Sequence, residues 1–383
     1  MGSQPKAAIS KRGLIRVALI LVSLSVINSG CQKHPDEFFK SDLQDGHNRG
    51  EDKFISEKGL KQTNLVADFA GLNAARIDTN LTNAWGIAIN PVGILWISSN
   101  GKGRSVVYDK NGVTKRPPVG ISDHGLINGG NPSGVVFNST ADFIIPATNE
   151  KSKFIFAGES GKIYAWSSGD STRIVADRSS SGAVYKGIEI AMDGGANFLY
   201  ATNFHAGTVD VFDKNFNYIN TKPFNDPGIS AGFSPFNIRL INNKLFVTYA
   251  KLLAPANHDD EKGPGNGYVN IFKTNGSLVR RFVTRGKLNS PWGIEKAPAG
   301  FGLSDNIILI GNFGDGRITA FDLEEGEFET QLTLKNTKMP LSIDGLWAIT
   351  FPDGNIPGDN PNKLYFTAGP NGESNGLFGY LAK

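Results

Sequence analysis

The chain contains one cysteine, three methionines and five histidines among its 383 residues. A single cysteine excludes an internal disulfide, so covalent cross-links do not hold the fold together. Beyond an apolar segment near the N-terminus, no stretch shows the 3.6-residue apolar period of an amphipathic helix, which argues against a helical protein. The sequence also lacks a P-loop, a Rossmann turn, a Gly-x-Ser-x-Gly elbow and an HExxH pattern, so the common nucleotide-binding and hydrolase signatures are absent.

The chain also lacks a basic excess. Its formal net charge is +3, but four of its 39 basic residues (Lys6, Lys11, Arg12 and Arg16) lie near the N-terminus. Removing these four leaves 35 basic residues against 36 acidic ones. No basic stripe remains to neutralise phosphates, and we therefore expect no nucleic-acid partner.

The N-terminus reads as an export signal. Residues 1–30 combine a basic start, a short apolar run and the small pair Ser29-Gly30, which is typical of a signal peptide. Cys31 follows directly and resembles the cysteine of a bacterial lipobox, which implies lipidation at Cys31 and a membrane anchor. We expect a lipoprotein of the bacterial outer membrane that faces the periplasm or the surface. The alternative is an ordinary secreted protein with a free thiol. Residues 31–61 are polar and predict a flexible tether.

What the chain has in abundance is glycine (46) and phenylalanine (25), together with a repeat. Six similar segments begin with NAWGIAI, NPSGVVF, VYKGIEI, FSPFNIR, SPWGIEK and GLWAITF, at residues 83, 131, 184, 233, 290 and 345. Steps of about 50 residues built from short strands and tight turns are typical of a β-propeller. The sequence therefore predicts an all-β, six-bladed propeller with four-stranded blades over residues 62–383.

Within each blade, the first strand lies innermost. The predicted second strands are residues 94–100, 142–149, 198–204, 244–250, 306–312 and 363–369, and the predicted third strands are 104–109, 162–167, 208–213, 268–273, 317–322 and 377–381. The sixth blade stops at its third strand. Residues 63–69 can supply the missing outer strand, which would close the ring and remove its exposed edges.

Turns into the inner strands and turns between second and third strands meet at one mouth of such a ring. They place aromatic side chains (Trp85, Tyr185, Phe236, Trp292, Trp347) and amides (Asn100, Asn149, Asn203, Asn312) around the mouth. A ring of this kind suits a small molecule or a glycan. In the alternative, the aromatic residues pack between blades and the amides cap turns.

Departures from the repeat are better site candidates than the repeat itself. The largest is the loop 251–267 in blade four, named the lid below, which carries His258, Asp259 and Asp260. These side chains are candidate ligands for a divalent cation such as calcium or zinc, and the alternative is a solvated acidic loop. His124 and His205 are predicted near the same mouth.

Two inner-strand carboxylates are the last departure. Glu189 and Glu295 each follow the repeated glycine by two residues in an otherwise apolar strand. Burial beside a channel is costly for a carboxylate unless it is hydrated, paired or bound to a metal. The alternative to a functional role is contact with channel water or with a cation from a neighbouring blade.

The segments NLTNAWGIA, HDDEKGPGNGYVNIF, NSPWGIE, GNFGDGRI, IDGLWAITF and LYFTAGPNGESNGLFGYL together resemble a bacterial family of conserved hypothetical secreted proteins. The resemblance implies a six-bladed propeller related to the NHL and TolB-like superfamily, and export. More distant relatives include metal-dependent lactonases of the gluconolactonase type, which hold a divalent ion with acid and amide side chains. Glu189, Asn203 and Asp344 are the residue types of that set, but no motif carries the activity over.

These observations favour an exported, lipid-anchored, monomeric propeller that binds a small molecule, glycan or protein partner through its lid. The second hypothesis is a metal-dependent hydrolase or lactonase with a site at the channel mouth. The third is a purely structural protein of the cell envelope.

Overall fold

The computed structural model describes residues 59–337, 339–352, 356 and 358–383. The predicted signal peptide, Cys31 and almost all of the predicted tether lie outside these residues. Within the described part of the chain, the helices are single 3-10 turns, and none has the length and apolarity that a membrane-spanning helix needs.

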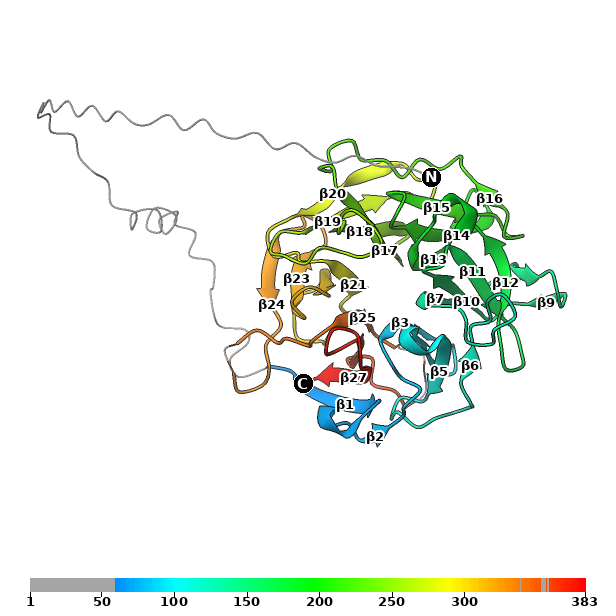
Figure 1. Ribbon diagram of the computed structural model, residues 1–383. Coiled ribbons are helices and arrows are strands. Elements are labelled where there is room, and N and C mark those ends of the chain that lie inside the picture. The colour runs from blue at the N-terminus through cyan, green and yellow to red at the C-terminus, as the bar shows by residue number, and fades with distance from the viewer. Residues whose placement is uncertain (1–58, 338, 353–355, 357) are drawn as a thin grey trace, which may run out of the picture. The chain divides into compact units, whose positions relative to one another are not determined.

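Six antiparallel sheets surround a central channel, which confirms the predicted six-bladed, four-stranded propeller. Figure 1 shows the first strand of each blade around the centre. Blade one consists of β3–β6 (Ala84–Ile89, Leu95–Ser99, Arg104–Tyr108, Val119–Gly120), and blade two of β7 and β10–β12 (Pro132–Phe137, Phe154–Gly158, Lys162–Trp166, Arg173–Asp177). Blade three consists of β13–β16 (Tyr185–Asp193, Ala196–Asn203, Thr208–Phe212, Tyr218–Ile219). Blade four consists of β17–β20 (Phe233–Ile241, Lys244–Lys251, Gly267–Phe272, Leu278–Thr284). The last two blades are β21–β24 (Pro291–Lys296, Ile307–Asn312, Ile318–Asp322, Phe328–Gln331) and β25–β27 (Leu346–Thr350, Leu364–Ala368, Leu377–Ala382), the latter joined by β1 (Lys61–Ala67).

The two ends of the described chain close the ring together. Strand β1 pairs antiparallel with β27, with Gln62 opposite Leu381 and Val66 opposite Phe378. Val66 and Ala67 are fully buried. The predicted closure is therefore confirmed, and β2 (Arg76–Ile77) adds a short parallel strand outside β1.

The repeated glycine has a steric cause. A Cβ on Gly86 would lie 2.5 Å from the Ser133 carbonyl oxygen, and one on Gly187 would lie 2.6 Å from the Asn237 Cα. A Cβ on Gly134 would lie 2.9 Å from the Lys186 carbonyl oxygen, and one on Gly293 would lie 2.9 Å from the Trp347 carbonyl oxygen. Each glycine thus lets its inner strand approach the inner strand of the next blade. The repeat marks the ring, named the glycine ring, where neighbouring inner strands come into close contact.

Blade two differs from the prediction. Its second strand is β10 (Phe154–Gly158), not residues 142–149. The predicted segment instead forms a small separate hairpin of β8 (Ile144–Ile145) and β9 (Glu150–Lys151). Its apolar residues Phe143 and Ile145 are buried against the ring, which explains why the run looks like a blade strand.

Candidate functional site

A cluster of aromatic rings fills the channel where the inner strands begin, on the face that also carries the lid and is named the lid face. The Trp347 ring is stacked between Trp85 at 3.8 Å and Phe313 at 3.7 Å, measured between ring centroids. Trp292 and Phe236 meet Trp347 edge-on. All five side chains are at most 4% exposed. Trp85, Trp292 and Trp347 therefore lie together as predicted, but as a buried floor below the mouth.

Lys186 interrupts this aromatic set. The residue before the repeated glycine is Trp85 in blade one and Trp292 in blade five, and in blade three it is Lys186. The Lys186 side chain is 1% exposed, and its ammonium lies 5.0 Å from the centroid of the Trp85 ring. A lysine is almost never buried so deeply without a partner.

Glu159 is that partner. Its Oε1 accepts a 2.5 Å hydrogen bond from Lys186 Nζ, and Asp259 Oδ1 of the lid lies 3.5 Å from the same ammonium. Burial alone would lower the pKa of Lys186, but these two carboxylates hold it above its usual value. Glu159 is thus the counter-ion that makes the buried lysine tolerable.

The polar contacts continue from Glu159 around the mouth. Glu159 Oε2 accepts a 2.7 Å hydrogen bond from Asn100, and Asn83 donates to Glu373 at 2.8 Å. A longer contact of 3.4 Å links Asn83 to Asn100, and Asn83 Oδ1 accepts from the Trp347 indole at 2.8 Å. The resulting network, named the mouth network, contains Trp347, Glu373, Asn83, Asn100, Glu159, Lys186 and Asp259.

The lid joins the mouth network to the aromatic floor. Its base is a β-bridge between Leu252 and Asp260, and Leu252 packs on the aromatic cluster. Glu261 N donates to the Lys251 carbonyl oxygen at 2.8 Å, and Gly263 N donates to Asn289 Oδ1 at 2.7 Å. These contacts fix a lid whose acidic tip bends back over the mouth.

His258, Asp259 and Glu159 form the metal-ligand set that the structure supports. Their ligand atoms all lie within 4.8 Å of one another. A 3.1 Å contact joins His258 Nδ1 and Asp259 Oδ1. It raises the pKa of His258 and, from the other side, lowers the pKa of Asp259 to about 2. The Lys186 ammonium contacts both carboxylates, however, and a metal ion here would have to compete with it.

Several buried polar atoms below the lid have no hydrogen-bond partner among the described residues. They include the indole nitrogens of Trp85 and Trp292. The Ser290 hydroxyl lies beside the Asp260 carboxylate of the lid, a contact that opposes the effect of burial on its pKa. Trp85 and Trp292 are 2% and 4% exposed, and burial raises the pKa of Asp260. An unpaired buried polar group costs about 1–3 kcal/mol. These atoms are therefore hydrogen-bonding groups that the lid face itself leaves unused.

The other predicted histidines do not join His258. The His124 side chain is 77% exposed, and its Nδ1 lies 2.6 Å from Asp123 Oδ1, which also pairs with Lys162. His205 is exposed in the turn after β14, near Gly182. Within the described residues, the group of metal-ligating side chains contains neither His124 nor His205. His124 and His205 thus lie outside the metal-ligand set that contains His258.

The predicted ring of amides and aromatics holds only in part. Asn100 joins the mouth network, whereas Asn203 and Asn312 accept backbone N–H groups and cap turns. Asn149 lies exposed in the β8–β9 hairpin, away from the mouth position that Glu159 occupies after β10. Tyr185 packs between blades and donates to Asp210 at 2.7 Å. Asn149 and Tyr185 were thus wrongly assigned to the mouth.

Glu189 and Glu295 lie beyond the glycine ring, toward the opposite mouth, named the far face. Both pair with Arg239 of blade four: Glu295 Oε2 is 2.9 Å from Nη2, and Glu189 Oε2 is 3.8 Å from Nη1. Glu189 also accepts backbone N–H groups from Ile190 and Leu240. Burial raises the pKa of Glu189. A cation from a neighbouring blade is thus the partner of both carboxylates.

The lactonase-like set does not converge on one point. Asn203 pairs with Tyr185 in the blade-three ladder and Glu189 pairs with Tyr200. Their positions are thus separated by three residues along β14, or about 10 Å. Asp344 is exposed in a turn, where it accepts the Asn371 N–H.

Sequence reasoning missed Glu159, Lys186, Asn83, Glu373 and Arg239. For Lys186 the signal was present, because a lysine occupies the position that holds tryptophan in three other blades. Glu159 was hidden by the misplaced second strand of blade two. Glu373 and Asn83 are 290 residues apart, and no local pattern indicates that they meet.

No family model matches the chain. It is 32% identical over 334 residues to the uncharacterized protein L690 of Acanthamoeba polyphaga mimivirus, a match that covers 84% of this chain and 86% of that protein. It is 31% identical over 322 residues to the uncharacterized protein R648 of the same virus, a match that covers 81% of this chain and 77% of that protein.

Solved structures show the same architecture. An α-L-arabinofuranosidase of Fusarium graminearum aligns with a TM-score of 0.53 at 12% identity, over 85% of this chain and 98% of that one. The soluble aldose sugar dehydrogenase of Escherichia coli aligns with a TM-score of 0.53 at 12% identity, over 84% and 99%. An inactive variant of virginiamycin B lyase from Staphylococcus aureus aligns with a TM-score of 0.51 at 13% identity, over 85% of this chain and 100% of that one. At these identities the likeness shows the fold alone.

Proposed function

The chain belongs to the same family as the uncharacterized mimivirus proteins L690 and R648, and we propose that it is a propeller that binds a small polar ligand under its lid. The observation that carries the proposal is the set of unpartnered buried atoms at this site. Trp85 and Trp292 offer N–H donors that have no acceptor among the described residues. A ligand with acceptor atoms would pair them.

The charges of the mouth restrict the ligand further. Glu159, Asp259 and Glu373 are members of the mouth network, and Lys186 is its one lysine. An anionic ligand would meet these carboxylates at short range, in a partly buried place where charge repulsion is weakly screened. The proposed ligand is therefore neutral or cationic.

The test uses a variant that removes one donor and keeps its ring. A library of neutral and cationic metabolites is screened by thermal shift on the wild type and on Trp292→Phe. We expect hits whose affinity falls about tenfold in Trp292→Phe, the worth of one good hydrogen bond. Trp166→Phe is the matched control, because the Trp166 indole already donates to Gly169 in the outer part of blade two.

The lid gives a second, independent arm. Replacing residues 254–264 by a short turn removes Asp259 and Asp260 but keeps the pair of Lys186 with Glu159. We expect thermal stability to stay close to that of the wild type while binding of the same hits is lost. Unchanged binding after this excision would rule out the lid as part of the site.

A metal-dependent hydrolase is the second candidate, favoured by the clustering of Glu159, His258 and Asp259 within 4.8 Å. If these residues hold an ion, calcium or zinc raises the melting temperature of the wild type and leaves that of His258→Ala unchanged. Elemental analysis of the purified protein is the accompanying measurement. The absence of both bound metal and a metal-dependent shift would remove this candidate.

Export and lipid anchoring at Cys31 belong to the same proposal, supported by the N-terminal sequence. We expect the wild type to partition into the detergent phase of a Triton X-114 separation and Cys31→Ser to remain in the aqueous phase. A wild-type protein found in the aqueous phase would favour the secreted alternative.

A further inference from the structure

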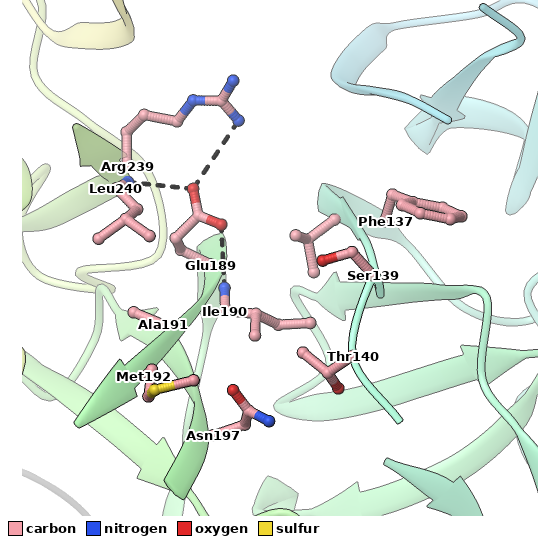
Figure 2. Close-up of a pocket in the computed structure, with 11 residues that line it drawn as sticks. Phe137, Ser139, Thr140, Glu189, Ile190, Ala191, Met192, Asn197, Arg239 and Leu240 are labelled. Atoms are coloured by element: carbon pink, nitrogen blue, oxygen red, sulfur yellow. Dashed lines mark hydrogen bonds and ion pairs between the residues drawn. The ribbon is translucent and has the colours of Figure 1, made fainter. Parts of the chain in front are cut away.

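A separate hollow opens at the far face, where the inner strands of blades two, three and four end. Its volume is about 470 Å³, which is within the usual range for small-ligand sites. Figure 2 shows Glu189 and Arg239 on one side, and Ser139 and Thr140 of the loop after β7 across from them. Three neighbouring blades thus contribute to one concave surface.

The polar groups of the hollow include both donors and acceptors. The Arg239 side chain is 37% exposed, and the hydrogen bonds of its guanidinium to Glu295 and Thr350 use only Nη2. Ser139 adds an exposed hydroxyl. Asn197 donates its amide N–H to Asp142 at 2.9 Å, and the amide oxygen is the acceptor that it can offer to a ligand.

Apolar side chains complete the wall. Ile190, Ala191 and Leu240 line the hollow beside Glu189, and Met192 lies at its edge with 61% of its side chain exposed. A wall that alternates between apolar patches and hydrogen-bonding groups suits a ligand with C–H faces and hydroxyl edges. Exposed methionine adapts readily to such a surface.

The charges here nearly cancel. One guanidinium faces two carboxylates, and burial favours the neutral form of Glu189 by raising its pKa. A charged ligand of either sign would disturb the pairing of Arg239 with Glu189 and Glu295. A ligand that hydrogen-bonds without net charge would leave the pairing intact.

We propose that this far-face hollow is a binding site for an uncharged polyhydroxylated ligand, namely a short saccharide. The site is distinct from the lid site. Between the two, the channel holds only a small void of about 30 Å³, lined by Gly134, Ile188 and Trp292 among others, which is far smaller than a ligand site. A saccharide bound at the far face does not reach the lid.

The experiment titrates the full protein with neutral mono- and disaccharides (glucose, galactose, maltose, cellobiose, lactose and xylobiose) by calorimetry. Glucuronate and glucosamine serve as the anionic and cationic probes. We expect at least one neutral sugar to bind more tightly than both charged ones. Ser139→Trp, which fills the hollow and leaves the residues of the ion pair unsubstituted, weakens binding at least tenfold. Arg239→Lys keeps the charge, loses the planar fork and weakens binding in the same direction.

The matched control is Ser277→Trp, which places the same ring at an exposed position in the β19–β20 turn, outside the hollow. It should leave saccharide affinity unchanged, as should excision of lid residues 254–264. The proposal is overturned if none of the neutral sugars binds, if a charged probe binds more tightly, or if Ser139→Trp binds as well as the wild type. Loss of sugar binding on lid excision would instead place the sugar at the lid site and overturn the far-face assignment.

Discussion

At the scale of single residues, the positions that depart from the repeat determine the polar contacts of the lid face. Lys186 occupies a tryptophan position and brings a charge into the aromatic floor, and Glu159 of the preceding blade neutralises it. A buried pair of this kind adds little net stability over an apolar pair, but breaking it leaves an uncompensated charge. Its role is to fix where the mouth network and the lid meet.

Lys186→Met tests this role. We expect a loss of about 3–5 kcal/mol in the free energy of unfolding, because Glu159 would remain partly buried without its cation. The double variant Lys186→Met/Glu159→Gln should recover most of the loss, since it removes the orphaned charge. Chemical denaturation measures both, and a double variant no more stable than the single one contradicts the argument.

His258 and Asp259 give the lid a defined pH window. The pKa of His258 is raised in the folded state by Asp259, so its stabilising contribution is full below the ordinary histidine value of about 6.5 and is lost as the pH rises through the raised value. The pKa of Asp259 is lowered to about 2, so its contribution is full above its ordinary value of about 3.9 and is lost as the pH falls toward 2.

An NMR titration of His258 measures the first half of this window. We expect the wild-type pKa above the ordinary histidine value and a return toward that value in Asp259→Asn. Because the Asp259 side chain is 65% exposed, the pair should contribute less than about 1 kcal/mol, and only between the two limits. Equal titration of His258 in both proteins would contradict the pairing.

At the scale of elements, the β8–β9 hairpin shows how an insert attaches to a blade. Phe143 is fully buried and its ring lies 5.4 Å from that of Phe216 in blade three. Ile144 points outward with 39% exposure. The hairpin is therefore anchored by one face, although it belongs to no blade.

Phe143→Ala should lower the free energy of unfolding by about 3–5 kcal/mol, the usual result of emptying a phenylalanine site in a core. The neighbouring variant Ile144→Ala is the control and should change it by less than about 0.5 kcal/mol, as an outward-facing surface substitution does. Urea denaturation distinguishes the two. Equal effects would mean that the hairpin is not anchored in this way.

At the scale of the whole molecule, stability depends on closing the ring with β1. Deleting β1, residues 61–67, exposes the edge of β27 and removes the burial of Leu65 and Val66. We expect a loss of about 5 kcal/mol, from roughly 1.5–3 kcal/mol for each buried side chain. The melting temperature should fall by about 10 °C. Thr63→Ala, which is half-buried in the same strand, should leave it almost unchanged, and a deletion variant that keeps the wild-type melting temperature would refute closure.

The sequence by itself determined the ring, because its cause is local and repeated. In four of the six blades a glycine is needed where neighbouring inner strands touch, so the spacing of the six repeated segments counts the blades, and the absent outer strand of the sixth predicts the closing strand. The lid and the inner-strand glutamates were visible for the related reason that they depart from that pattern. Where a local pattern misled, as for residues 142–149, the buried face of an insert had the same apolar signature as a blade strand.

Only the tertiary structure decided which departures act together. It paired Lys186 with Glu159, connected Asn83 to Glu373 across the chain ends, separated His124 and His205 from His258, and joined Glu189 and Glu295 through Arg239. It also placed the hollow at the far face, away from the lid. These contacts depend on the closing of the ring, which brings together residues that no periodicity in the sequence relates.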